Sequence, residues 1–465
     1  MSTHFDCVVI GAGPGGYVAA IRLAQLGKTV AIVEKKYWGG VCLNVGCIPS
    51  KALLRHAEIA HLLGSGRDMF GIDGEVSVSY ERAVERSREV SSGRVKGIHY
   101  LMKKNGITEY FGEATFVDSH RLTVTLESGG EEDLTFDGCV IATGATDALL
   151  PGVSLGQRIV TYETQILETD VPETITIVGA GPIGVEFSYL LASFGSQVTL
   201  IEYADRVLPN EDPAVSKEIH RSLSGLGVTI LVGHSVQAIT ETEDRSTTSA
   251  TSGEDTVTIE SAVTMVAIGF RPRVDGYGLE NTGVRLTDKG AIDVDHQMRT
   301  SVEHIFAIGD VTAKLSLAHV AETQAVVAAE ALAGEDPVGI HDYRFMPRAV
   351  FAQPEVASFG LTLEQAKLDG YPASVVKFPF MANGKAHALG DASGFIQLVV
   401  DDSTRTLLGA HLVGPHVAEL LPELTLAHSA GLTVDQLNAN VHIHPTLSEA
   451  VQEAIHGAAG HMINF

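Results

Sequence analysis

Two of the chain's four cysteines, Cys42 and Cys47, lie in the segment GGVCLNVGCIPSK, residues 39–51. Such a pair supports metal binding, a structural cross-link, or reversible oxidation to a disulfide. A structural zinc ion needs four ligands, and no second close cysteine pair accompanies this one, so we predict no metal. Because four cysteines in 465 residues cannot form a disulfide scaffold, a catalytic role is favoured over a structural one.

The surroundings of the pair also favour redox chemistry. Cys7 and Cys139 lie within apolar strand-like runs and fit inert buried thiols, whereas Cys42 and Cys47 are flanked by glycines. On an ideal helix, positions five apart have Cα atoms about 8–9 Å from each other. A disulfide needs Cα atoms within about 7 Å, so the segment must be distorted between the two cysteines or become helical only at Cys42. A bond formed there is easier to reduce than a structural disulfide.

A nucleotide-binding pattern precedes the cysteines. Residues 5–13, FDCVVIGAG, read as a strand that ends in the turn GAGPGG, with Gly11, Gly13 and Gly16 in the GxGxxG spacing. These glycines permit a tight turn, the approach of a pyrophosphate, and close helix–strand packing. The start of the following helix offers free amides to phosphates. The next strand ends at Glu34, which can accept a hydrogen bond from a ribose hydroxyl.

The same unit recurs 168 residues later, from Gly11 to Gly179. ITIVGAGPIG contains Gly179, Gly181 and Gly184, and VTLIE ends at Glu202. The duplication predicts that the chain binds two dinucleotides. A carboxylate at the ribose position repels a 2′-phosphate, so Glu202 favours NAD over NADP. Arg206 could bind such a phosphate, but the neighbouring Glu202 carboxylate would repel it.

Two more strand ends carry glycine turns, Thr143–Gly144 in IATGA and Gly309–Asp310 in HIFAIGD. Together with the first glycine turn and the cysteine motif, they resemble the FAD- and NAD(P)-dependent disulfide reductases, the class I pyridine nucleotide-disulfide oxidoreductases. The resemblance covers nearly the whole chain. It implies an α/β fold, with two Rossmann-like dinucleotide-binding domains for FAD and NAD and a C-terminal α+β dimerisation domain.

The resemblance also assigns roles around the flavin. It makes Cys42 the thiol that exchanges with the substrate and Cys47 the thiolate that faces the flavin, with Lys51 near the flavin and paired with Glu186. The motif is closest to the members that act on dihydrolipoamide, although Val41 stands where the family commonly has threonine. The other cofactor contacts that the resemblance implies are Lys35, Gly40, Val41, Cys42, Ala114, Ile183, Gly269 and Ala318.

A base near neutral pH is needed to deprotonate a thiol substrate, and histidine is the simplest choice. The C-terminal segment HIHPTLSEAVQEA offers His444 with Glu449, whose carboxylate can orient the ring. A capped helix start is the alternative reading of this segment. The family's C-terminal motif matches it and implies that the histidine serves the second subunit's active site. We expect His442 to be structural and His319 to lie near the flavin.

Four segments are predicted along the chain. They are the first part of the FAD domain with the redox disulfide (1–150), the NAD domain (151–274), the second part of the FAD domain (275–345) and the dimerisation domain (346–465). Within the NAD domain, the polar run 240–256 is predicted to be an exposed hairpin tip.

The net charge of −25 argues against nucleic acid and anionic membranes as partners. No apolar stretch suits a membrane span, and a strand pattern begins at once, so we expect a cytoplasmic protein. The resemblance implies a homodimer that oxidises dihydrolipoamide with NAD⁺. The substrate would be carried by lipoyl domains of the acyltransferase core of 2-oxo acid dehydrogenase complexes. Alternatives are an NAD(P)H-dependent reductase of another low-molecular-weight disulfide, an oxygen-consuming flavoprotein oxidase, and a non-catalytic scaffold.

Overall fold

The computed structural model describes residues 2–74 and 76–465, which form two compact units. Each unit is assembled from three separate stretches of the chain. Because one unit contains both the predicted NAD and dimerisation domains, the predicted domain boundaries stay a prediction. The first unit comprises Met1–Ala52, Arg82–Ala148 and Gly269–Tyr343, and the second comprises Leu53–Glu81, Leu149–Ile268 and Arg344–Phe465.

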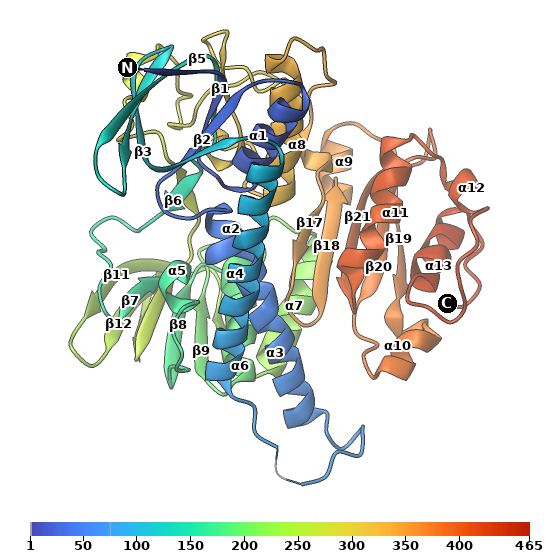
Figure 1. Cartoon of the computed structure of the whole chain (residues 1–465). Helices are drawn as coiled ribbons and strands as arrows, with labels where there is room; N and C mark the ends of the chain where they lie inside the picture. Colours follow the sequence, from blue (N-terminus) through green and yellow to red (C-terminus); the bar gives the residue numbers. More distant parts are fainter. Residues whose placement is uncertain (1, 75) are drawn as a thin grey trace. The chain divides into compact units, whose positions relative to one another are not determined.

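A six-stranded sheet forms the centre of the first unit (Figure 1). Its strands are β1 (Thr3–Ile10), β2 (Val30–Glu34), β3 (Thr108–Asp118), β4 (Arg121–Leu126), β5 (Glu131–Ile141) and β16 (Ile305–Ala307). The parallel order is β3–β2–β1–β5–β16, and β4 joins β3 to β5 by antiparallel pairing. Valine and isoleucine runs that are buried on both faces are typical of such parallel strands. The glycine turns therefore follow strands whose carboxyl ends meet at one edge of the sheet.

Helices α1 (Pro14–Gln25) and α8 (Ala318–Leu332) pack together beside this sheet. The guanidinium of Arg22 lies 2.6 Å from the carboxylate of Glu330. A Cβ atom at Gly15 would lie 3.3 Å from the Ala321 Cβ, so a larger residue there would push the two helices apart. The remaining helices and strands of this unit are α2 (Gly40–Asn44), most of α4 (Tyr80–Lys104), β6 (Ala145–Asp147) and β15 (Phe270–Pro272). Helix α3 (Cys47–Ser65) begins in the first unit and belongs to the second unit from Leu53 on.

The second unit contains a five-stranded parallel sheet in the order β10–β9–β8–β14–β7. Its strands are β7 (Ile159–Thr161), β8 (Thr174–Val178), β9 (Gln197–Ile201), β10 (Thr229–Leu231) and β14 (Val263–Val266). Helix α6 (Pro182–Ser193) follows β8, and α7 (Pro213–Gly225) connects β9 to β10. This is the second strand–turn–helix unit that the duplicated glycine pattern predicts.

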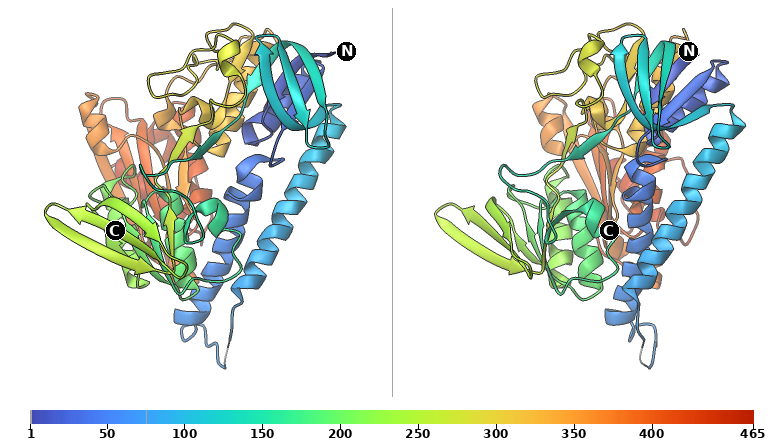
Figure 2. Two further views of the ribbon diagram at one scale, coloured as in Figure 1. Left: turned by 90° about the vertical axis from the view of Figure 1, so that its left-hand side faces the viewer. Right: turned by 60° about the vertical axis from the view of Figure 1, so that its left-hand side comes forward.

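The prediction of an exposed hairpin tip over 240–256 holds for the exposed turn 242–245 but not for the whole run. The run contributes the central strand of a three-stranded antiparallel sheet, seen in yellow-green in Figure 2. Its strands are β11 (Ser235–Glu241), β12 (Ser246–Ser252) and β13 (Asp255–Ser261). Ser246 and Thr248 are fully buried because their hydroxyls hydrogen-bond the Thr264 hydroxyl, at 2.8 and 3.1 Å. Polar composition alone does not reveal that pairing.

An antiparallel sheet in the order β17–β18–β21–β20–β19 completes the second unit. Its strands are β17 (Arg348–Val350), β18 (Glu355–Gly360), β19 (Ala373–Pro379), β20 (Phe395–Asp401) and β21 (Leu407–Gly414). Apolar side chains of α11 (Val417–Ser429) and α13 (Glu449–Ala458) share a core with the sheet, which contains Phe359, Phe378 and Leu412. The short helices α5 (Tyr162–Gln165), α9 (Leu363–Leu368), α10 (Gly384–Leu389) and α12 (Val434–Leu437) lie in connecting segments. The predicted fold class is confirmed.

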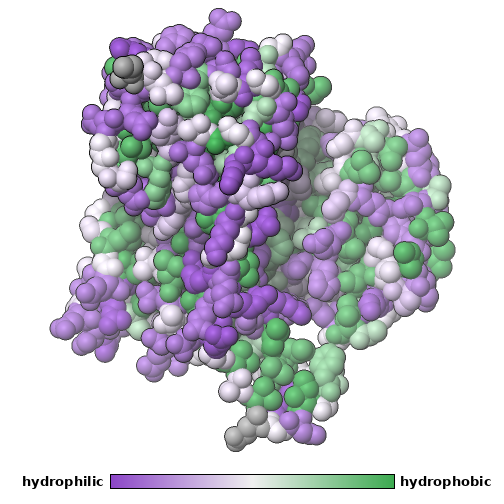
Figure 3. Space-filling view, in the orientation of Figure 1, coloured by the Kyte–Doolittle hydropathy of each residue, from purple (hydrophilic) through white to green (hydrophobic). Residues whose placement is uncertain are grey.

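An apolar surface lies at the far end of α3, where Figure 3 shows a group of hydrophobic side chains. Leu62, Met69 and Phe70 are 40%, 66% and 46% exposed. Contiguous apolar surfaces of this kind are typical of sites that bind another protein. Among the described residues, no helix is long and apolar enough to cross a membrane.

Candidate active site

The first glycine turn has two glycines that the fold requires and one that it does not. Gly11 has a φ of +100°, and a Cβ there would lie 2.3 Å from the carbonyl oxygen of Ala142; a Cβ at Gly16 would lie 1.9 Å from the Gly11 oxygen. Gly13 has an ordinary φ of −68°, and the nearest atom to its Cβ would be 3.8 Å away. A bound group that approaches the backbone accounts for glycine at this position, as a pyrophosphate would.

Glu34 lies at the end of β2 beside this turn. Its carboxylate accepts hydrogen bonds from the backbone nitrogens of Ala12 at 2.8 Å and Lys36 at 2.7 Å, while Lys35 extends to Glu113 at 2.7 Å. A groove at the carboxyl edge of the sheet brings five of the predicted cofactor contacts together. They are Gly11, Glu34, Lys35, Ala114 and Thr143.

Asp310 provides a second test of whether a flavin dinucleotide fits this unit. It follows the turn at Gly309, whose φ is +72° and whose nitrogen donates to Gln324 Oε1 at 2.7 Å. Desolvation raises the pKa of Asp310 to about 6, although a hydrogen bond with Ser316 opposes the shift. A partly buried carboxylate of this kind fits a polyol chain, whose hydroxyls would donate to it. Ala318 begins α8, and Gly144 has a φ of +71°.

The second turn repeats this geometry. Gly179 has a φ of +103°, and Cβ atoms at Gly179 and Gly184 would lie 2.4 and 1.9 Å from backbone oxygens, whereas a Cβ at Gly181 would meet nothing within 4 Å. Glu202 accepts hydrogen bonds from Ala180 N at 2.7 Å and Ala204 N at 2.8 Å. The second unit thus carries the same open glycine and the same acid as the first, and it fits a second dinucleotide.

The remaining predicted contacts of the second dinucleotide lie on α6 and after β14. Ile183 is in the first turn of α6 and is partly exposed. Glu186 on the same helix is 7% exposed and accepts a hydrogen bond from the Phe351 nitrogen at 3.0 Å. Gly269 adopts a φ of +113°. The predicted pairing of Glu186 with Lys51, which lies in α3, stays a prediction.

The two cysteines of the motif lie on different helices. Cys42 is in α2, which ends at Asn44, and Cys47 is the first residue of α3. The expected distortion is therefore a complete break in the helix. A Cβ at Gly46 would lie 3.2 Å from the Cys42 Cα, so the tight connection favours glycine.

Both cysteines are thiols in the structure and interact with each other. The hydrogen bond with Cys47 and burial raise the pKa of Cys42. A raised pKa favours the thiol form of Cys42. The start of a helix also favours negative charge at Cys47.

The turn between the cysteines is held from both sides. Asn44 Nδ2 donates to the carbonyl oxygens of Trp38 and Gly40, at 2.8 and 2.9 Å. The guanidinium of Arg88, in α4, donates to the backbone carbonyl oxygen of Asn44. Gly40 has a φ of +68° and lies close to Gly13, so the cysteine motif begins directly beside the first glycine turn. Val41 is partly buried.

His444 and Glu449 form a hydrogen-bonded pair near the C-terminus. His444 Nδ1 lies 2.8 Å from Glu449 Oε1, and the two side chains are 82% and 26% exposed. Desolvation acts to raise the pKa of Glu449, but hydrogen bonds from Thr446 N and His444 hold it below its ordinary value. A carboxylate that accepts from Nδ1 leaves Nε2 as the basic nitrogen, exposed and able to take a proton.

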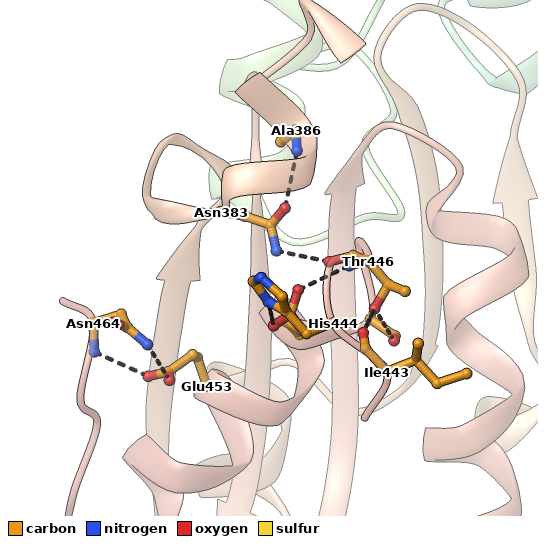
Figure 4. A network of polar contacts seen from close by, with 9 residues as sticks. Asn383, Ala386, Ile443, His444, Thr446, Glu453 and Asn464 are labelled. Carbon is orange, nitrogen blue, oxygen red and sulfur yellow. Dashed lines mark hydrogen bonds and ion pairs between the residues drawn. The ribbon is translucent and has the colours of Figure 1, made fainter. Parts of the chain in front are cut away.

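Asn383 supports this pair, a role that sequence reasoning missed. Its side chain is buried, caps α10 by accepting from Ala386 N at 2.9 Å, and donates to the Thr446 oxygen at 3.1 Å. The Thr446 nitrogen donates in turn to Glu449 at 2.8 Å. Figure 4 shows Asn383, Thr446 and His444 in one polar network. More than fifty positions separate Asn383 from the histidine, so no local pattern could reveal the contact.

Two other histidines are placed by the structure. His442 is 5% exposed in its side chain, and its Nε2 lies 3.0 Å from Glu423 Oε2, a geometry that suits a structural residue. His319 lies in the first turn of α8 and is exposed. Within the described ranges, no three histidine, cysteine or acidic residues are grouped so that they could hold a metal ion.

Sequence comparison identifies relatives along the whole chain. Residues 5–325 match the family described as pyridine nucleotide-disulphide oxidoreductase, and residues 346–455 match its dimerisation domain. Dihydrolipoyl dehydrogenase of Mycobacterium tuberculosis is 56% identical over 463 residues, and that of Bacillus subtilis is 40% identical over 477 residues. Each alignment covers 100% of this chain and 100% of the relative.

Solved structures agree with this assignment. The crystal structure of LpdA from Mycobacterium tuberculosis has a TM-score of 0.89 at 26% identity, and HOCl-induced flavoprotein disulfide reductase RclA from Escherichia coli has 0.86 at 28% identity. Both comparisons cover 97% of this chain and 99% of the other. With its duplicated glycine turns, its cysteine pair and these matches, the chain belongs to the pyridine nucleotide-disulphide oxidoreductase family.

Proposed function

We propose that this protein is a dihydrolipoyl dehydrogenase, which oxidises dihydrolipoyl groups to lipoyl groups and reduces NAD⁺ to NADH. The observation that carries the proposal is the full-length identity of 40–56% to bacterial enzymes of that name. The cysteine pair and the His444–Glu449 pair supply the groups that this chemistry needs.

The exchange of thiol and disulfide follows from the chain's own residues. His444 Nε2 takes the proton of one substrate thiol, and the resulting thiolate attacks Cys42 Sγ of the oxidised pair, so that Cys47 leaves as a thiolate. The second substrate thiol then displaces Cys42, which closes the cyclic lipoyl disulfide and leaves both cysteines reduced. Glu449 keeps the histidine ring in the orientation that exposes Nε2.

The cofactors are FAD and NAD. We propose that Gly13, Glu34 and Asp310 hold the FAD, and that Gly181 and Glu202 hold the NAD. FAD supplies, when bound, a two-electron carrier between the cysteine pair and the nicotinamide. Cys47 and Lys51, at the start of α3, would face it. The open glycine of each turn is the observation that supports these two sites.

The active enzyme is proposed to be a homodimer in which His444 serves the cysteine pair of the second subunit. The match to a dimerisation domain supports this arrangement. Val441 and Ile443, next to His444, are 85% and 76% exposed in the single chain, as expected of apolar residues that another subunit covers. The proposed partners are lipoyl domains of the acyltransferase core of 2-oxo acid dehydrogenase complexes, and the proposed compartment is the cytoplasm.

A turnover assay tests the substrate. The FAD-loaded enzyme should oxidise dihydrolipoamide with NAD⁺, and in reverse it should reduce lipoamide with NADH. Glutathione disulfide and other small disulfides should be reduced far more slowly under the same conditions. Faster turnover of one of them would replace the proposal with the alternative of a small-disulfide reductase. Rapid oxygen consumption without any disulfide would point instead to an oxidase.

Glu202 should control the choice of nicotinamide cofactor. Two unit charges 4 Å apart in water interact by about 1 kcal/mol, so removing this carboxylate should narrow the preference for NAD⁺ over NADP⁺ by about fivefold. Glu202→Gln is the informative change, because the amide oxygen can still accept from Ala180 N. Steady-state kcat/KM for both cofactors gives the ratio. An unchanged ratio in the glutamine variant would remove Glu202 from this role.

Replacing Asn383 by alanine should lower the rate of dihydrolipoamide oxidation by about tenfold, less than the loss of the base itself. Its amide holds the Thr446 carbonyl, and Thr446 N holds Glu449 in place. Asn383→Asp keeps a good cap for α10 but loses the donor to Thr446, so its kcat should fall as well. Asn464→Ala is the matched control, because it removes a donor to Glu453 on the same helix. Equal losses in the Asn383 and Asn464 variants would mean a general effect on stability.

A further inference from the structure

A groove beside α7 has no place in the proposed reaction. It is bounded by the loop after β9, one side of α7, and β19 and β20 of the antiparallel sheet, and its volume is about 910 Å³. Small-molecule sites commonly occupy about 300–1,000 Å³. The residues of both dinucleotide turns, including Gly181 and Glu202, lie outside its lining. We call it the α7 groove.

The lining of the α7 groove contains more lysine and arginine than acidic residues, in a chain whose acidic residues outnumber its basic ones by 57 to 32. Two carboxylates, Asp205 and Glu218, also line it, and each is paired with a neighbouring arginine. The basic side chains are Arg206, Lys217, His220, Arg221 and Lys377. The lining contains four lysine and arginine side chains and two carboxylates, so its net charge is positive, whereas the net charge of the whole chain is negative.

Two ammonium groups, those of Lys217 and Lys377, line the groove together with the Glu218 carboxylate. Lys377 lies over the ring of Phe395, 3.3 Å from its centroid. Desolvation lowers the pKa of Lys377, and Lys217 lowers it further, against the opposite effect of Asp212 and Glu218. In addition, the Nε of Arg206 is buried and has no hydrogen-bond partner in the described part of the chain. An anion between these groups would relieve their repulsion, and phosphate oxygens are the acceptors that lysine and arginine bind best.

The groove is connected to the second dinucleotide turn by direct hydrogen bonds. Ser216 of α7 donates to the Leu208 oxygen at 3.2 Å, and the Leu208 nitrogen donates to the Ala180 oxygen at 2.8 Å. Arg206 donates to the Pro209 oxygen in the same loop, at 3.2 Å. The loop 203–212 therefore contacts both the groove and the residue that lies between Gly179 and Gly181.

We propose that the α7 groove binds a phosphate-bearing small molecule of nucleotide size, and that its binding tightens the binding of NAD. The ligand fixes the loop whose Leu208 nitrogen donates to the Ala180 carbonyl. The loop therefore loses less conformational entropy when the dinucleotide binds. Coupling between two sites is reciprocal and typically amounts to about 5–150-fold in affinity. The reaction itself proceeds without this ligand.

Inorganic tripolyphosphate is a suitable probe, because it carries the charge without an adenosine group. The FAD-loaded enzyme is saturated with NAD⁺ to block the dinucleotide site, and tripolyphosphate is titrated by calorimetry at constant ionic strength. Binding should weaken at least tenfold in a variant with Lys217→Glu and Lys377→Gln. Lys289→Glu, an exposed change in the first unit, lowers the net charge by 2 against 3 in the double variant, and the enzyme that carries it should bind the probe like the wild type.

The affinity for NAD⁺, measured with and without the probe, tests the coupling. Tripolyphosphate should lower the Kd of NAD⁺ about fivefold in the wild type and leave it unchanged in the Lys217→Glu, Lys377→Gln variant. Absence of binding at millimolar concentrations, or equal weakening in Lys289→Glu, would overturn the site. Binding that leaves the Kd of NAD⁺ unchanged would overturn the coupling. Neither result depends on which disulfide the enzyme turns over.

Discussion

Replacing His444 by alanine should slow dihydrolipoamide oxidation by about 10²–10⁴, the usual worth of a general base. The exposed Nε2 is the nitrogen that can take a proton from the substrate thiol, because Nδ1 is engaged with Glu449. Stopped-flow measurement of the reaction with dihydrolipoamide, without NAD⁺, isolates this step. Reduction of the enzyme by NADH needs no thiol proton and should stay near the wild-type rate. Glu449→Ala should show the same pattern with a smaller loss.

Mixed dimers separate the two subunits' contributions. His444→Ala and Cys47→Ser are both expected to be inactive as homodimers. In a mixed dimer, one active site keeps both wild-type groups and the other keeps neither, so part of the activity should return. No recovery after verified subunit exchange would contradict the assignment of His444 to the other subunit's cysteines.

Replacing Cys42 by serine should lower the rate of dihydrolipoamide oxidation by about 10⁴ or more, as expected when a covalent catalytic group is lost. No disulfide can then form with Cys47, and the substrate thiolate has no sulfur to attack. Cys139→Ala is the matched control, because Cys139 is a buried thiol in β5. It should keep most of the activity. Similar losses in both variants would mean that the cysteine pair has no special role.

Absorption spectra distinguish the two sulfurs of the motif. About one equivalent of dithionite added anaerobically to the wild type should produce a long-wavelength charge-transfer band from the Cys47 thiolate to the flavin. Cys42→Ser keeps that thiolate and should show the band before any reduction. Cys47→Ser should lack it under both conditions. The reverse pattern would exchange the roles of Cys42 and Cys47.

The strand–turn–helix units were predictable because their requirements are local. A turn with a φ near +100° needs glycine whatever surrounds it, and Gly11 and Gly179 both adopt this angle. The break between Cys42 and Cys47 was predictable in the same way, since helix geometry alone forbids a disulfide at that spacing. The pairing of His444 with Glu449 is likewise a contact between near neighbours in the sequence.

Contacts between distant residues were not predictable from the sequence. Asn383 looks like the start of a short helix, and only the fold places its amide against Thr446. The polar segment around Ser246 lacks the hydrophobic alternation of a strand, yet its hydroxyls are buried against Thr264. In the α7 groove, Lys217 and Lys377 meet through the packing of α7 on the antiparallel sheet. In each case the partner is chosen by tertiary packing, which a local pattern does not encode.

The assembly of the first unit from three separate stretches has a consequence for its synthesis. When Ala148 leaves the ribosome, β5 still lacks its neighbour β16, and α1 lacks α8 and the ion pair between Arg22 and Glu330. The segment 149–268 must be made before these partners appear. Domains form during translation only once their own residues are available. The parallel sheet of the second unit can therefore fold while the sheet of the first unit still has an open edge at β5.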